Sequence, residues 1–133
     1  MLDLKGRDPR LAHEVLAAVE PHLGTGERIT ICARHWPLVE LLRGADGVRA
    51  LHSVGSARQL RRLRRRQGGA RLEGVTIHER LLDSRTVQEL RELADLIFTW
   101  PINTVERAHE LVRLGVDGLI SDRPGLLQPV VGG

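Results

Sequence analysis

Cysteine, lysine and large aromatic residues are nearly absent from this sequence of 133 residues. Cys32 is the one cysteine, which excludes a disulfide framework or a cysteine-based zinc site within one chain. Trp36, Phe98 and Trp100 are the whole complement of Phe, Trp and Tyr, too few for the base-stacking platforms of single-strand binders. No apolar run approaches the roughly 20 residues that cross a bilayer, and the amino terminus lacks the apolar core of a secretory signal. A cytoplasmic protein is therefore expected, with no transmembrane segment.

The overall amino-acid composition is that of a globular protein. A hydrophobic fraction of 41% can bury an ordinary core, and we expect one domain over residues 1–133. The net charge of +3 comes almost wholly from arginine, because Lys5 is the sole lysine, so it says little about partners. Cys32 ends an apolar stretch and is expected to be a buried small hydrophobe.

The hydrophobic pattern alternates between short strands and helices. Strands are expected at 2–5, 28–32, 48–51, 74–77, 96–99 and 118–121. Helices are expected after Asp8-Pro9, over 57–67, from a cap at Ser84, and over 104–114 up to a left-handed cap at Gly115. This order is typical of parallel strands joined by right-handed crossovers, so the class is α/β. Periodicity alone does not separate an open doubly wound sheet from a segment of a barrel.

Two segments near the end of the chain are distinctive, TWPINT at 99–104 and LGVDGLISDRP at 114–124. In this order and at this spacing they resemble the last two strands of the glycerophosphodiester phosphodiesterase barrel. Upstream, the acid-x-lysine segment at Asp3 and Lys5 is similar to the third strand of that family, where the acid is normally glutamate. The resemblance implies a partial (β/α)8 (TIM) barrel of about six β/α units, strands three to eight, with the first two missing.

The family is a group of hydrolases of lipid metabolism that convert a glycerophosphodiester and water to glycerol 3-phosphate and an alcohol. It uses a divalent metal, Mg or Ca, with histidines as acid and base. By resemblance, Asp3 is expected to ligate the metal, Lys5 to be a catalytic residue that contacts the phosphate, and Trp100 to form an apolar wall beside the alcohol. Asp3 and Lys5 lie two apart on a strand, so both side chains should share one face.

The family's histidine-arginine-glycine motif, its glutamate-x-aspartate motif and the histidine that follows have no counterpart in this sequence. We therefore expect a truncated barrel whose reading frame extends upstream by about two units, on the order of 60 to 100 residues. The chain alone is expected to be weakly active or inactive. We also expect it to self-associate, because six strands leave two edges unpaired.

The remaining polar residues each have a structural interpretation beside a functional one. Arg34-His35, His52 and His78-Glu79 follow strands and could face a pocket, although a surface or capping role is the ordinary interpretation. Asn103 is expected to cap a helix together with Glu106. The segments at Asp117-Gly118 and 122–124 are expected to be structural, with Asp122 accepting hydrogen bonds from following amides.

Two other functions stay open from the sequence. The first is a non-catalytic barrel remnant or assembly module. The second, weaker, is a basic nucleic-acid-binding protein, because six arginines fall in the expected helix at 57–67. A basic helix of this kind is more often a solvated outer helix, so nucleic acid is an unlikely partner.

Overall fold

The computed structural model describes residues 1–66 and 69–132, which fall into two compact units, Met1–Ser53 and Val54–Gly133. All six strands expected from the sequence are present, each within three residues of its expected bounds. The expectation of one domain over the whole chain stays a prediction.

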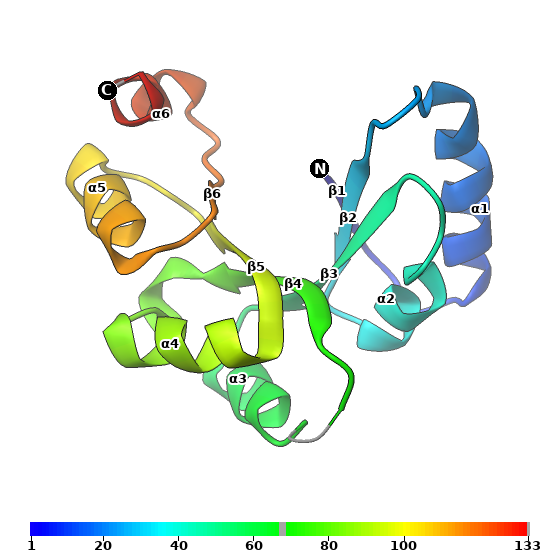
Figure 1. Cartoon of the computed structure of the whole chain (residues 1–133), viewed down its shortest axis with the longest axis horizontal. Helices are drawn as coiled ribbons and strands as arrows, with labels where there is room; N and C mark the ends of the chain where they lie inside the picture. The colour runs from blue at the N-terminus through cyan, green and yellow to red at the C-terminus, as the bar shows by residue number, and fades with distance from the viewer. Residues whose placement is uncertain (67–68, 133) are drawn as a thin grey trace. The chain divides into compact units, whose positions relative to one another are not determined.

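The first unit is a three-stranded parallel sheet with its helices on one face (Figure 1). Its elements are β1 (Leu2–Leu4), α1 (Arg10–Val19), a 3-10 helix η1 (Glu20–His22), β2 (Ile29–Ala33), α2 (Trp36–Leu42) and β3 (Val48–Val54). The strands are adjacent in chain order, and Asp3 lies opposite Cys32, which lies opposite Leu51. Side chains therefore alternate between a helix-covered face and the face that carries Asp3.

The helix-covered face of the first unit holds a continuous apolar core. Its buried members are Ala12, Val19, Ile31, Ala33, Leu38, Val39, Leu42, Val48 and Ala50. The short helix α2 was not expected from the sequence. It begins at Trp36 with Pro37 in its first turn, where a missing amide costs nothing. The indole of Trp36 is buried and donates from Nε1 to the Ser53 carbonyl oxygen at 2.9 Å.

The second unit has the same alternation. Its elements are α3 (Ala57–Arg64), β4 (Leu72–His78), a 3-10 helix η2 (Glu79–Leu81), α4 (Ser84–Leu93), β5 (Ala94–Trp100), α5 (Val105–Leu114), β6 (Gly118–Leu119) and α6 (Pro124–Val131). The strands β4, β5 and β6 are parallel and adjacent in that order. The helix α6 was not expected from the sequence. It begins at Pro124 and contacts α5.

Pairing between β4 and β5 sorts their side chains onto two faces. Val75, Ile77 and Ile97 are fully buried on one face. The opposite face includes His78 and Trp100, which lie directly across from each other and are half-buried. This second face is the one that can meet a ligand, because part of each ring stays accessible.

Two helix caps lie one residue away from the expected positions. Asp83, not Ser84, caps α4 by accepting a hydrogen bond from the Thr86 amide at 2.7 Å. Likewise Thr104, not Asn103, caps α5 through the Arg107 amide at 3.2 Å. Two cap-forming residues stand side by side at each position, so the sequence alone does not choose between them.

Other helix ends fall near or at the expected places. The left-handed cap at Gly115 is confirmed by its φ of 93°. The first helix begins at Arg10, and the Asp8 carboxylate accepts the Arg10 amide at 2.9 Å. The helix α3 ends at Arg64, earlier than expected, and the expected end at Gln67 lies outside the described residues.

The helix α4 passes into β5 with no intervening loop. Leu93 is the last helical residue and Ala94 the first of the strand. Arg71, just before β4, stabilises the junction by donating to the carbonyl oxygens of Arg91, Glu92 and Ala94 at 2.8, 3.1 and 3.0 Å. These carbonyls end a helix and have no intrahelical partner, so one guanidinium replaces a capping loop.

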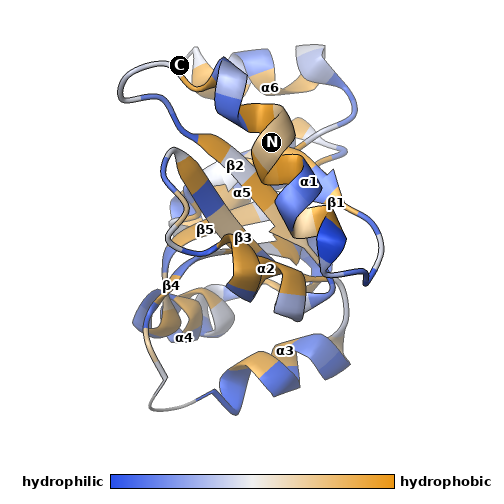
Figure 2. Cartoon of the chain, turned by 90° about the vertical axis from the view of Figure 1, so that its right-hand side faces the viewer, coloured by the Kyte–Doolittle hydropathy of each residue, from blue (hydrophilic) through white to orange (hydrophobic). Residues whose placement is uncertain are grey.

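The basic helix α3 has one hydrophobic side and one hydrophilic side (Figure 2). Leu60 and Leu63 are buried, whereas Arg58, Arg61, Arg62 and Arg65 are exposed. This arrangement is that of an outer helix with a solvated face. None of the helices in the described part of the chain is long and apolar enough to cross a membrane.

Candidate functional site

The two distinctive segments of the sequence are hydrogen-bonded to each other. The Ile120 amide donates to the Thr99 carbonyl at 2.9 Å, and the Ile102 amide donates to the Ile120 carbonyl at 2.9 Å. Ser121 Oγ donates to the Ile102 carbonyl at 2.8 Å. The segments thus form one framework that continues from the carboxyl ends of β5 and β6, the end of the strands where barrel enzymes place function.

Asp117 fixes this framework at its other end. Its Oδ2 atom accepts the Ile97 amide at 2.7 Å, while its own amide donates to the Ile97 carbonyl at 2.8 Å. The same carboxylate forms an ion pair with Arg91 at 2.7 Å, and Arg91 also donates to the Gly115 carbonyl. The structural interpretation of Asp117 is therefore confirmed.

Asp122 was expected to accept hydrogen bonds from the amides that follow it. The structure gives this role to a neighbouring residue: the Arg123 amide donates to Ser121 Oγ at 3.0 Å. A hydroxyl two residues before the amide has the reach for such a turn.

Gly118 is required because an aromatic ring occupies the space of a side chain. A Cβ atom at this position would lie 2.6 Å from Cδ1 of Phe98, its partner across the sheet. Gly118 thus leaves space for the Phe98 ring on the face of the sheet that also carries Trp100.

We expect Gly118→Ala to lower the free energy of unfolding by about 1–2 kcal/mol, because the Phe98 ring must move or leave its rotamer. Urea unfolding followed by circular dichroism measures the change. Gly125→Ala is the matched control, since a Cβ there meets nothing within 4 Å. Equal stability of the two variants would show that the ring relaxes without cost.

Trp100 is the last residue of β5, directly after the strand expected at 96–99, and its ring contacts another ring. The imidazole of His78 meets the indole in an edge-on arrangement, with centroids 5.0 Å apart and planes at 67°. His78 also caps η2, because its Nδ1 atom accepts the Arg80 amide at 3.2 Å. The expected capping role of His78 is confirmed, and the contact with Trp100 was not foreseen.

Glu79, the neighbour of His78, is bound to α5. Its Oε2 atom accepts from Arg107 Nε at 2.7 Å, and Arg107 Nη2 donates to the carbonyls of Glu79 and Leu82 at 2.8 and 3.3 Å. Arg107 therefore anchors η2 to α5. Partial burial acts to lower the pKa of the Arg107 guanidinium, but hydrogen bonds to Glu110 and Glu79 outweigh it, so the pKa is raised above its ordinary value.

Asp3 and Lys5 share one face, as expected, and form an ion pair of 2.6 Å between Oδ2 and Nζ. Both side chains are exposed, Lys5 the more so. Cys32 lies opposite Asp3 in the sheet and is 3% exposed, so its expected burial is confirmed. Burial, and then the charge and hydrogen bond of Asp3, raise the pKa of the Cys32 thiol to about 12.

The residues that the structure describes do not by themselves fit the divalent metal that the resemblance implies. Within residues 1–66 and 69–132, no three side chains of the His, Cys, Asp or Glu types form a group that could hold a metal ion. A divalent cation needs several converging ligands, and Asp3 alone offers one carboxylate that already contacts Lys5. The metal-ligating role of Asp3 stays a prediction.

His52 does not face a pocket. It is fully buried on the helix-covered side of β3, where its Nε2 atom lies 3.0 Å from Glu40 Oε1. Its ring also meets Trp36 edge-on, with centroids 5.6 Å apart. Both the pocket and the surface interpretation of His52 are wrong, because its side chain points toward α2 and not toward the other face of the sheet.

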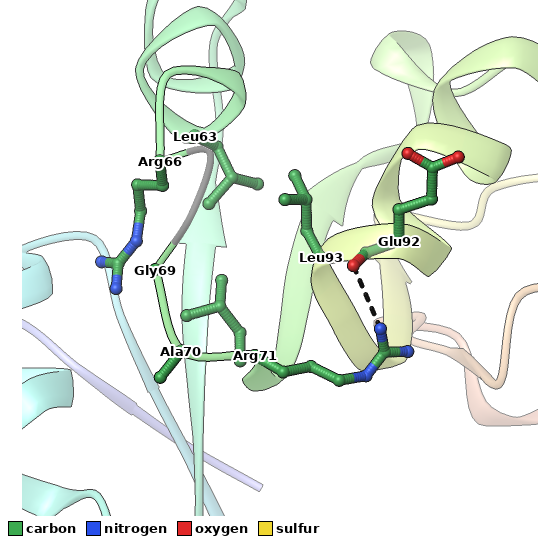
Figure 3. Close-up of a pocket in the computed structure, with 8 residues that line it drawn as sticks. Leu63, Arg66, Gly69, Ala70, Arg71, Glu92 and Leu93 are labelled. Carbon is green, nitrogen blue, oxygen red and sulfur yellow. Dashed lines mark hydrogen bonds between the residues drawn. The ribbon is translucent and has the colours of Figure 1, made fainter.

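Two hollows in the described part of the chain lie away from these residues. One, of about 160 Å³, lies between the end of α3, the start of β4 and the end of α4 (Figure 3). Leu63, Leu72 and Leu93 line it together with Arg66 and Arg71. It lies at the amino end of β4, the end of a barrel strand that serves stability. A second, open hollow lies between the starts of α5 and α6.

Comparison with known proteins identifies the fold. No protein-family model matches the sequence, and no curated protein matches it. A solved structure from Silicibacter pomeroyi, assigned as a glycerophosphoryl diester phosphodiesterase, matches 98% of this chain with a TM-score of 0.76 and 20% identity. An Oleispira antarctica phosphodiesterase in complex with its product sn-glycerol-3-phosphate matches 99% with a TM-score of 0.73 and 19% identity. The glycerophosphodiester phosphodiesterase of Thermotoga maritima matches 99% with a TM-score of 0.68 and 14% identity.

The chain spans about half the length of these structures, covering 49%, 54% and 57% of each. At sequence identities of 14–20%, these structural matches establish likeness of fold. The partial barrel expected from the sequence is confirmed, with six parallel strands and alternating helices. The chain therefore has the fold of a partial (β/α)8 barrel, similar to about half of a glycerophosphodiester phosphodiesterase.

Proposed function

We propose that this chain is part of a phosphoric diester hydrolase that converts glycerophosphodiesters to glycerol 3-phosphate and an alcohol. The observation that carries the proposal is the match of nearly the whole chain to phosphodiesterase structures, one of them holding sn-glycerol-3-phosphate. The framework of the two distinctive segments supports it, because their hydrogen bonds hold Trp100 at the end of a strand.

Lys5 is proposed to contact the substrate phosphate. Its ammonium is exposed, and its ion pair with Asp3 orients it without burying it. An ammonium within hydrogen-bond distance of a phosphate oxygen stabilises negative charge in both the ground state and the transition state. Asp3 is proposed to hold Lys5 in place, and to ligate a metal only if further ligands come from outside this chain.

Trp100 is proposed to pack against the alcohol portion of the substrate. Its indole is half-buried, so one part is fixed in the protein and another can meet a ligand. Large flat side chains provide much apolar contact area with little loss of conformational entropy.

The proposal predicts that the purified chain binds sn-glycerol 3-phosphate, and that Lys5→Ala weakens binding roughly tenfold or more through loss of a charge-assisted hydrogen bond. Isothermal titration calorimetry measures the affinity. Arg113→Ala, which removes an exposed cation of α5, is the matched control and should bind as the original chain does.

Inorganic phosphate and glycerol serve as comparison ligands in the same titrations. If sn-glycerol 3-phosphate binds no more tightly than inorganic phosphate, or if the Lys5 and Arg113 variants weaken equally, the chain attracts anions only by net charge. Turnover of glycerophosphocholine by the chain alone is expected to stay near background, because the family's histidine motifs are not in this sequence.

A further inference from the structure

The ring contact between His78 and Trp100 links the end of β4 to the end of β5. The two residues lie opposite each other in the parallel pairing, and both are half-buried on the same face. Edge-to-face ring pairs at this separation favour one relative orientation over others. The imidazole therefore restricts the angle at which the indole is presented.

The orientation of the imidazole is itself fixed by a hydrogen bond. Nδ1 of His78 accepts the backbone amide of Arg80 at 3.2 Å and so caps η2. An imidazole nitrogen accepts a hydrogen bond only when it carries no proton, so this bond requires the neutral ring, protonated on Nε2. A second proton would place two N–H groups against each other and break the cap.

The two charged residues that follow His78 in the chain are themselves engaged. Glu79 is paired with Arg107 of α5, and the Arg80 guanidinium donates to the Gly55 carbonyl at 3.4 Å. These contacts hold η2 in position while the imidazole changes its protonation state. The side of His78 toward β5 carries the Trp100 ring.

We propose that His78 is a positioning residue for Trp100, holding the indole at a fixed angle while the imidazole is neutral and releasing it on protonation. The functional meaning rests on the proposed role of Trp100 as a substrate contact: the alcohol-binding surface would be ordered near and above neutral pH and loosened in acid. The physical coupling of the two rings does not depend on that role.

Fluorine NMR of the full chain tests the coupling without any substrate. Incorporation of 5-fluorotryptophan gives two resonances, because the sequence holds only Trp36 and Trp100. Trp100→Phe assigns the second. We expect the Trp100 resonance to shift with pH as the His78 imidazole takes up a proton, and to stay constant in His78→Phe, which keeps a ring but cannot take a proton.

His109→Gln removes an exposed imidazole of α5 and should leave the Trp100 titration unchanged. His78→Gln replaces His78→Phe if the phenylalanine variant fails to fold. A Trp100 resonance that does not move with pH in the original chain overturns the proposal, as does a titration that persists in both His78 variants.

Titrating the chain with glycerophosphocholine at pH 7.5 and pH 5.5 then tests the functional part. If the affinity is equal at the two pH values while the Trp100 resonance shifts as expected, only the role of Trp100 in binding is refuted.

Discussion

Replacing Asp117 with alanine should lower the free energy of unfolding by about 2–3 kcal/mol. The variant removes the acceptor of the Ile97 amide. Because Ile97 is fully buried, its amide would then be shielded from water without a hydrogen-bond partner. It also removes the ion pair with Arg91, a smaller contribution because both side chains are partly exposed. Urea unfolding measured by circular dichroism gives the value.

Asp117→Asn separates the two contributions. Its side-chain oxygen still accepts the Ile97 amide, whereas the charge that pairs with Arg91 is lost, so the cost should stay below about 1 kcal/mol. If the asparagine variant is as destabilised as the alanine variant, the charge and not the hydrogen bond stabilises this strand.

Native Cys32 should react about a thousandfold more slowly with iodoacetamide at pH 8 than the unfolded chain does. Only the thiolate reacts, and a pKa of about 12 in place of 9.0 lowers the thiolate fraction by this factor. Mass spectrometry of the alkylated chain, with and without urea, measures both rates. Burial of the sulfur can only add to the protection.

Two variants test the source of this effect. Asp3→Asn should raise the native rate, because the Asp3 carboxylate is the second cause of the raised pKa, whereas Asp8→Asn should not. Equal native and unfolded rates would contradict the burial of the thiol. The free energy of unfolding should depend on pH for the same reason, because folding favours the neutral Cys32 thiol. The contribution of this thiol is complete below about pH 9 and is lost as pH rises toward about 12.

Much of the fold could be predicted from local patterns. The strands around Ile31, Ile77 and Ile97 are short, apolar and buried, which is what a parallel sheet requires. The helix α2 could not, because seven residues starting at Trp36-Pro37 offer too few turns for a periodic signal.

The site was less accessible to prediction from sequence. The shared face of Asp3 and Lys5 was predicted, and so was a strand that ends next to Trp100. The contact of Trp100 with His78 depends on the register between two strands, and the bond from Asp117 to Ile97 spans 20 residues. No local pattern carries that information, because a shift of one residue in pairing would place His78 on the opposite face.

The direct passage from α4 into β5 makes residue count at this point critical. Arg71 binds the carbonyls of Arg91, Glu92 and Ala94, and no loop between the helix and the strand could absorb an extra residue. One residue inserted after Leu93 could not bulge outward. It would advance β5 by a single position and exchange its two faces, moving Trp100 in among the apolar residues and carrying buried Ile97 to the open side. Length variation within this fold is therefore excluded from the α4–β5 junction, and has to be accommodated in connections that contain a loop.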